Sequence, residues 1–173
     1  MKLTLKVAVI SVLSAAGLAL RTVAFPITAN VQITPGMIMP ILSGILLGLW
    51  PGVITGVIVG VYAAVFSGEF WLIPLIGNVC LSLGAGVVTA ILKSNKDNCS
   101  KMVMLVASPS IIGGFAPTFI IISLITPGAV IVALISGVFD MINALIASIL
   151  ALIAWSALKK AKLIERLNSP VED

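Results

Sequence analysis

The chain has 173 residues, of which 60% are hydrophobic and 9% are charged, and its mean hydropathy is +1.26. A soluble domain has about 25% charged residues, because its surface must be solvated. The composition therefore excludes a soluble globular protein and predicts an integral membrane protein. Histidine, the commonest metal ligand and general base, is absent from the sequence, so we expect no metal site and no cofactor.

Six apolar segments follow one another, and we interpret each as a membrane-spanning helix, since about 20 apolar residues cross a bilayer. The predicted spans cover residues 5–25, 36–50, 51–67, 70–93, 102–126 and 128–158, within one membrane domain that comprises residues 1–173. A basic tail, residues 159–173, ends the chain. We expect the second and third spans to be short and to meet in a turn at Trp50-Pro51-Gly52. The predicted fold class is an all-α bundle of six transmembrane helices.

The distribution of lysine and arginine predicts the orientation of this bundle. With both termini in the cytoplasm, Arg21 is the one external basic residue and all the others are internal. The pI near 9.3 therefore indicates membrane topology rather than nucleic-acid binding. An alternative for residues 1–24 is a cleaved signal peptide, which would leave five spans and an external N-terminus.

The segment after the first span, residues 26–35, is polar for this chain. It begins and ends with proline, contains Asn30 and Gln32, and follows Arg21 closely. The predicted topology places it on the external face. We interpret it as a lid over a binding site rather than as a simple connection, with Asn30 and Gln32 as candidate substrate contacts.

Candidate binding residues also lie in the outer halves of the fourth and fifth spans. Asn78 must form a hydrogen bond in apolar surroundings, either with another helix or with a bound solute. Trp71 is either a residue of the interfacial aromatic belt or a ring that stacks on the substrate. Phe115 is a further candidate, although core packing is the default role for it and for Phe119.

Two predicted spans depart from a regular helix. Pro109, Gly113-Gly114 and Pro117 predict a kinked or broken fifth span. The sixth span is too long for one crossing, so Gly128 to Gly137 is either a helix that projects outward or a loop folded over the external face.

Asp140 is the most informative residue, because an ionisable group within a span usually faces a cavity or a partner. Asn143 lies one helical turn later on the same face. Asp140 either contributes to a binding site or forms a structural salt bridge with Arg21, and the two roles are compatible. Arg21, Asp140 and Asn143 are therefore all candidate substrate-binding residues.

Small residues recur at every fourth position on two spans. The first span has Ser11, Ala15 and Ala19, and the third has Gly52, Gly56, Gly60 and Ala64. This spacing lets two helix backbones approach closely in lipid. Each row packs either within the chain or against another membrane protein, and the pattern alone does not distinguish these two possibilities.

Together these features resemble the substrate-binding S component of energy-coupling factor (ECF) vitamin transporters. The resemblance rests on Ala15 and Ala19, on the capping position of residues 26–35, and on the stretches SGILLGLWPGVITGVIVG and FDMINALIASIL. It implies that the face of Ser11, Ala15 and Ala19 docks on a transmembrane coupling subunit with two ATPases. It also implies a small water-soluble vitamin or vitamin precursor as substrate, and the cytoplasmic membrane of a prokaryote as location.

Two other classes of function stay open at this point. A self-assembling channel or small carrier would use the small-residue rows to oligomerise, without ATPase partners. A membrane enzyme is less well supported, since the chain lacks paired carboxylates, histidine and a nucleophile–base set. The chain also lacks a Gly-Lys-Ser/Thr phosphate-binding loop, so we expect any ATP to be hydrolysed by partner subunits.

Overall fold

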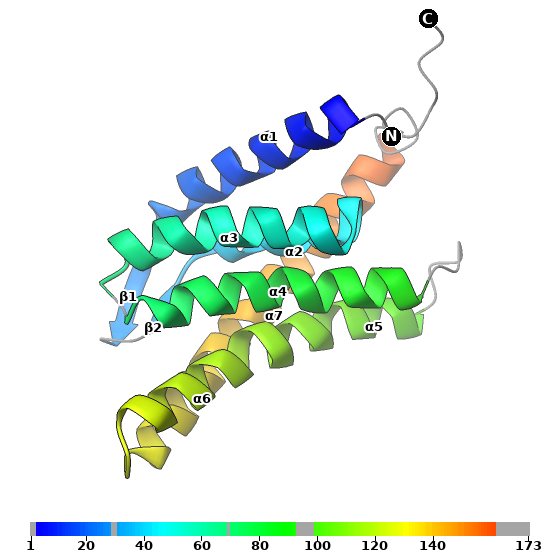
Figure 1. Ribbon diagram of the computed structural model, residues 1–173. Coiled ribbons are helices and arrows are strands. Elements are labelled where there is room, and N and C mark those ends of the chain that lie inside the picture. Colours follow the sequence, from blue (N-terminus) through cyan, green and yellow to red (C-terminus); the bar gives the residue numbers. More distant parts are fainter. Residues whose placement is uncertain (1–2, 29–30, 69, 93–98, 162–173) are drawn as a thin grey trace, which may run out of the picture.

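The computed structural model of the chain describes residues 3–28, 31–68, 70–92 and 99–161, with the backbone alone at residues 26–28 and 31–32. The helices are α1 (Leu3–Arg21), the 3-10 turn η1 (Pro35–Met37), α2 (Ile38–Leu47), α3 (Leu49–Phe66), α4 (Leu72–Ile91), α5 (Cys99–Ser108), the π-helical η2 (Pro109–Phe115), α6 (Ala116–Ile125) and α7 (Val130–Lys160). Two short strands, β1 (Phe25–Thr28) and β2 (Val31–Ile33), form an antiparallel hairpin. The helices pack in one elongated bundle (Figure 1).

Within the described residues, five helices are long and apolar enough to cross a membrane. One of them, Cys99–Ile125, comprises α5, η2 and α6, and a sixth apolar helix, Pro35–Leu47, is shorter. The prediction of an all-helical membrane bundle is confirmed. Over an apolar stretch of 18 residues in each helix, 56% of the residues are buried in α4 and 11% in α1, so α4 is central and α1 is peripheral.

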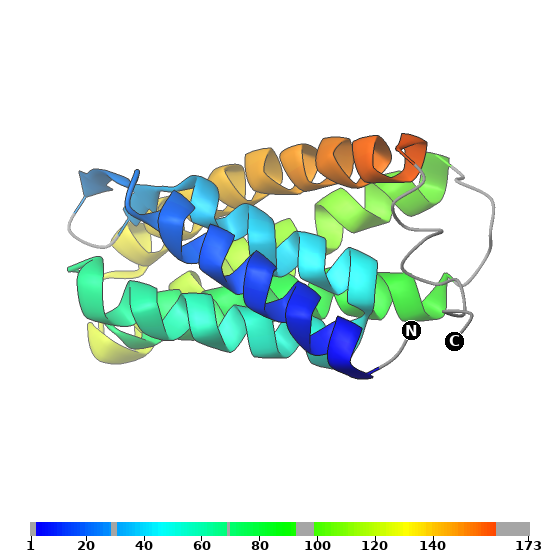
Figure 2. The ribbon, with the colours of Figure 1, turned by 90° about the horizontal axis from the view of Figure 1, so that it is seen from above.

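The two ends of the bundle differ in character. The start of α1 and the end of α7 lie at one end, and the β1–β2 hairpin lies at the other (Figures 1 and 2). The end that holds the start of α1 and the end of α7 carries lysines in the terminal turns of its helices, namely Lys6, Lys101, Lys159 and Lys160. We therefore call it the basic end and the opposite one the hairpin end.

The first helix ends earlier than predicted. It stops at Arg21, and Phe25 begins strand β1 rather than ending a span. Pro26 accounts for the extended conformation of Phe25, because proline disfavours the helical conformation in the residue that precedes it. The strand pairing joins Phe25 to Ile33 and Pro26 to Gln32, so the segment expected to form a lid begins as a β-hairpin.

The turn between α2 and α3 also differs from the prediction. The chain reverses at Gly48, whose φ of 88° favours glycine, and not at Trp50-Pro51-Gly52. Pro51 lies in the first turn of α3, where the missing N–H removes no intrahelical hydrogen bond. The proline therefore lies within the first turn of α3 and does not mark the reversal of the chain.

The glycine row of α3 packs inside the bundle. A Cβ on Gly52 would lie 2.9 Å from Gly44 Cα of α2, and one on Gly60 would lie 3.0 Å from Leu75 Cα of α4. At Gly56 a Cβ would lie 2.7 Å from the Asn78 carbonyl oxygen. For this row the structure favours packing within the chain over docking on a second protein.

The fifth predicted span is irregular, as expected from its proline and glycine residues. Residues Pro109–Phe115 form a π-helical segment between α5 and α6. A Cβ on Gly113 would lie 2.5 Å from the Leu81 nitrogen of α4, and one on Gly114 would lie 2.7 Å from the Asp140 carbonyl oxygen of α7. The π-helical segment and its two glycines thus allow η2 to pack closely against both α4 and α7, next to Asp140.

The last helix resolves the alternatives for Gly128 to Gly137. Apart from its first residues, this stretch is helical, because α7 begins at Val130 and runs for 31 residues. At 1.5 Å per residue α7 is about 46 Å long, which exceeds the ~30 Å hydrocarbon core of a bilayer. Figure 1 shows α6 and the start of α7 diverging from the other helices at the hairpin end.

Candidate functional site

Polar residues of α7 line up on its buried face. Ser136, Asp140 and Asn143 are spaced by four and three residues, and their exposed fractions are 5%, 6% and 4%. This spacing places them on one side of a helix. The sequence prediction that Asp140 and Asn143 share a face inside the bundle agrees with this arrangement.

Asp140 is held by the neighbouring helix. The hydroxyl group of Thr118 on α6 donates a hydrogen bond to Asp140 Oδ2, and both side chains are buried. The close approach at Gly114, one turn before Thr118, fixes the distance between the two backbones. Thr118 is not among the residues predicted from the sequence, although a hydroxyl residue within an apolar span is a signal for a hydrogen bond between helices.

Arg21 brings the end of α1 into the same region. Its side chain is 5% exposed, and its positive charge acts on the carboxyl group of Asp140. A Cβ on Gly36 would lie 3.0 Å from Arg21 Cδ, so η1 passes directly over the arginine. Arg21 thus packs against η1 at the end of α1, and the expected salt bridge between Arg21 and Asp140 stays a prediction.

A cavity of about 200 Å³ lies between the end of β2, the start of the second helical segment and the middle of α7, and Asn143 is its one lining residue from the polar face of α7. Its lining residues are Ile33, Thr34, Pro35, Ile38, Asn143, Ile146, Ala147 and Leu150. Thr34 is buried and caps η1, because its hydroxyl oxygen accepts a hydrogen bond from the Gly36 N–H at 3.1 Å. Most of the wall is apolar, and Thr34 and Asn143 supply its polar side chains.

This cavity joins two features that lie far apart in the sequence. Residues 33–35 belong to the polar segment interpreted as a lid, and Asn143 belongs to the polar face of α7. Of the other lid candidates, Gln32 is paired through its backbone with Pro26, and Asn30 lies outside the described residues, as does the Gln32 side chain.

Asn78 is buried at a different place, on α4, and does not line the cavity. Its Nδ2 donates a hydrogen bond to the Pro74 carbonyl oxygen at 2.7 Å, within its own helix. Its Oδ1 is buried and accepts no hydrogen bond from the described residues. The amide therefore keeps one unused acceptor, which a bound solute or water could use.

No protein-family model matches the chain, and no curated protein matches it either. A search of solved structures found the S component of a bacterial ECF transporter, with a TM-score of 0.66 and 18% sequence identity. The match covers 92% of this chain and 98% of that one. This chain has the fold of an ECF S component. The resemblance read from the sequence is confirmed at the level of the fold.

Within the S-component fold, the small-residue row of α1 faces outward. Ser11, Ala15 and Ala19 are exposed, whereas Ser14, Gly17 and Arg21 face the bundle. The Ser11 hydroxyl donates to the Val7 carbonyl oxygen of its own helix at 2.9 Å, so it needs no external partner. The row is exposed, unlike the glycine row of α3, which is buried.

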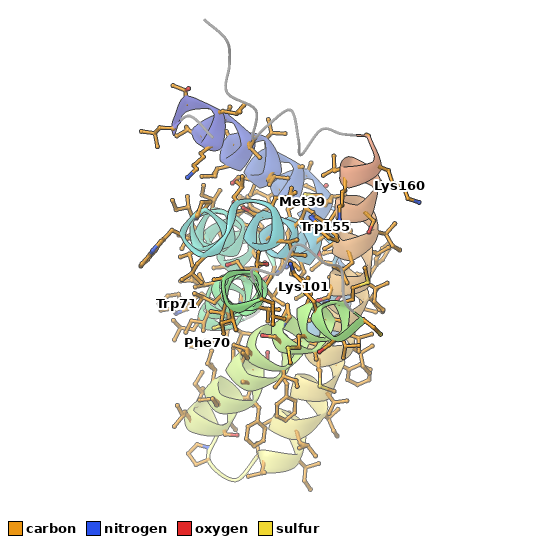
Figure 3. The ribbon with its side chains drawn as sticks, turned by 90° about the vertical axis from the view of Figure 1, so that its right-hand side faces the viewer. Met39, Phe70, Trp71, Lys101, Trp155 and Lys160 are labelled. Atoms are coloured by element: carbon orange, nitrogen blue, oxygen red, sulfur yellow. The ribbon has the colours of Figure 1, made fainter. Side chains whose placement is uncertain are left out.

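The aromatic candidates occupy two different settings in the S-component fold. Trp71 is 52% exposed and lies on the outer surface, on the side of the bundle away from α7 (Figure 3). The ring of Phe115 stacks on Phe119 with centroids 5.4 Å apart, and its edge lies against Gly137. The packing interpretation of Phe115 fits this environment, and Trp71 is remote from the polar face of α7.

The described residues hold no group of three or more His, Cys, Asp or Glu side chains that could bind a metal ion. Asp140 is the one acidic residue of the described chain, and its carboxyl group already accepts a hydrogen bond from Thr118. The arrangement is suited to binding a small molecule by hydrogen bonds and apolar contacts.

Proposed function

We propose that this chain is the substrate-binding subunit of an ECF-type importer. The proposal is supported mainly by the coincidence of the S-component fold with a cavity that unites the segment after α1 and the polar face of α7. The substrate is a small water-soluble vitamin or vitamin precursor, and Asn143 and Thr34 contact it directly. Arg21 and Asp140 position the wall of the site, and residues 26–35 close over it.

In this function the chain does no chemistry of its own. It docks through Ser11, Ala15 and Ala19 on a transmembrane coupling subunit, whose two ATPases hydrolyse ATP. The protein spans the cytoplasmic membrane of a prokaryote several times, and the basic end lies in the cytoplasm because positively charged residues are retained there. The hairpin end, with the cavity, then faces the outside.

The decisive experiment is identification of the small molecule that co-purifies with the full chain. The protein is purified in detergent without partners, and mass spectrometry measures what it releases on denaturation. We expect one vitamin-like compound at close to one molecule per chain, with rebinding in the nanomolar range. A chain that retains no small molecule, and binds none from a vitamin panel, would contradict the proposal.

A channel or an independent carrier is the alternative function. Burial of Gly52, Gly56 and Gly60 inside the chain removes one surface on which such an oligomer would assemble. Proteoliposomes that contain this chain alone distinguish the two functions. We expect no net solute flux until the coupling subunit, the ATPases and ATP are added, whereas a channel would conduct without them.

A further inference from the structure

A second depression lies toward the basic end of the bundle, further along α7 than the cavity beside Asn143. It has a volume of about 390 Å³ and lies between the first turn of α5 and the last turns of α7. Its lining residues are Met102, Ile149, Leu152, Ile153, Ser156, Ala157 and Lys160. The proposed substrate-binding function uses none of these residues, so the groove needs an explanation of its own.

The length of the groove corresponds to one leaflet of a bilayer. Along α7 it runs from Ile149 to Lys160, which is about 16 Å at 1.5 Å per residue. Half of the ~30 Å hydrocarbon core is about the same length. The Ile149 end and the middle are apolar, and Ser156 and Lys160 provide polar groups at the other end. A single acyl chain with a polar headgroup has the same order of groups.

The charge around the polar end is positive. Lys160 lines the groove, and Lys101 directly precedes the lining residue Met102 on α5 (Figure 3). Lys159 lies 5.2 Å from the centroid of the Trp155 ring, in a cation–π contact that holds a further positive charge at this level. Among the described residues the one carboxylate is Asp140, about 30 Å away along α7.

We propose that this groove binds an anionic phospholipid of the surrounding membrane. One acyl chain lies along Ile149, Ile153 and Ala157, and the phosphate group faces Lys160 and Ser156. Basic pockets between helices at the cytoplasmic surface are suited to anionic headgroups. Trp155 lies at the depth where aromatic side chains meet headgroups. The positive charge of the lysines favours an anionic lipid over a zwitterionic one. A zwitterionic lipid fills the apolar part of the groove equally well but is attracted less strongly to the lysines.

Native mass spectrometry of the delipidated full chain in detergent tests the proposal. The protein is titrated with palmitoyl-oleoyl phosphatidylglycerol and with phosphatidylcholine that has the same chains. We expect phosphatidylglycerol to bind at least about fivefold more tightly, and Lys160→Gln to remove about fivefold of its affinity. Ala157→Phe fills the groove and is expected to weaken the binding of both lipids, while its exposed position leaves the fold intact.

Lys6→Gln is the matched control, since Lys6 is a lysine of the same basic end but belongs to α1. It should leave the affinity for phosphatidylglycerol unchanged. Equal affinity for the two lipids, or equal losses in Lys6→Gln and Lys160→Gln, would overturn the proposal in favour of unspecific lipid contact. A photo-reactive amino acid at Ile153 that captures a polypeptide in cell membranes, and no phospholipid, would assign the groove to a protein partner instead.

Discussion

Thr118 on α6 donates a hydrogen bond to the carboxylate of Asp140 on α7, and both side chains are buried within the bundle. A carboxylate that is removed from water needs such donors, because leaving it unsatisfied is costly. The contact therefore fixes the rotation of α7 relative to α6. Since Asn143 is one turn further along α7, the same contact also determines where Asn143 faces the cavity.

Thr118→Val tests this relationship. The substitution keeps the size of the side chain but removes the donor, so we expect a loss of about 1–3 kcal/mol in stability. Thermal unfolding in detergent, followed by near-UV circular dichroism, measures the loss. Thr118→Ser retains the hydroxyl group and should remain close to the wild type. The amount of co-purified small molecule should follow the same order, with Thr118→Ser close to the wild type and Thr118→Val below it.

Asp140→Ala should weaken substrate binding as well as stability, because it removes the group that Thr118 and Arg21 face. In the double variant Thr118→Val/Asp140→Ala the two effects should not add, since residues in direct contact are coupled. Strict additivity of the unfolding free energies would contradict the contact. Unchanged substrate affinity in Asp140→Ala would indicate that the substrate site does not lie at this part of α7.

Asn143→Ala tests the cavity itself. Asn143 is a polar residue of the cavity wall, so loss of its amide should lower substrate affinity about tenfold, the effect of one good hydrogen bond. Isothermal titration with the identified ligand measures the change. Ser148→Ala is the control, because Ser148 is also buried on α7 but donates to the Ala144 carbonyl oxygen at 2.7 Å and does not line the cavity. Equal losses in the two variants would mean that Asn143 acts through helix packing.

Several elements of the fold could be predicted from the sequence because they follow from local rules. Pro109 and Gly113-Gly114 interrupt an apolar segment, and the structure has a π-helical segment there. Residues 128–158 form one long apolar segment, and the structure has the helix α7 over most of it. Each of these inferences needs only the length, polarity and backbone restrictions of a single segment.

Other features depend on contacts between segments and could not be predicted. The β1–β2 hairpin contains Phe, Ile and Val residues that membrane helices also use, so the short run gave no strand signal. The Thr118–Asp140 contact depends on how α6 and α7 rotate about their axes. The same holds for the two small-residue rows, since one is buried at Gly56 and the other is exposed at Ala15, although their spacing is identical.

Gly113→Ala tests the packing of the π-helical segment. A Cβ there would lie 2.5 Å from the Leu81 nitrogen and 2.6 Å from Leu81 Cα, so backbone must move. We expect a loss of about 1–3 kcal/mol, which is typical of overpacked sites. The matched control is Gly77→Ala, whose Cβ would lie at an ordinary 3.5 Å from the Gly113 carbonyl oxygen. Alanine should be neutral or stabilising at residue 77, by up to about 1 kcal/mol, because it favours helix more than glycine does.

The thermal unfolding midpoints of these two glycine variants are compared with that of the wild type. A Gly113→Ala protein as stable as the wild type would show that α4 and η2 are not in close contact in the membrane. A strong loss in Gly77→Ala would indicate tighter packing around residue 77 than the structure has.

The docking surface of α1 gives the last prediction. Ala15→Leu and Ala19→Leu each add bulk to an exposed row of small residues, so they should block close approach of the coupling subunit. Because neither side chain faces the bundle, the purified variants should retain the small molecule and unfold at the wild-type temperature. Uptake into cells or proteoliposomes that contain the coupling module should be abolished in the double variant.

Ala90→Leu provides the control for these variants, since Ala90 is an exposed alanine on α4 and receives the same added bulk. It should leave uptake intact. Persistent uptake with leucine at both residue 15 and residue 19 would show that the coupling subunit docks elsewhere. A loss of retained small molecule in the same variants would instead connect α1 to the substrate site, through the neighbouring Arg21, because that side chain lies on the inner face of the same helix.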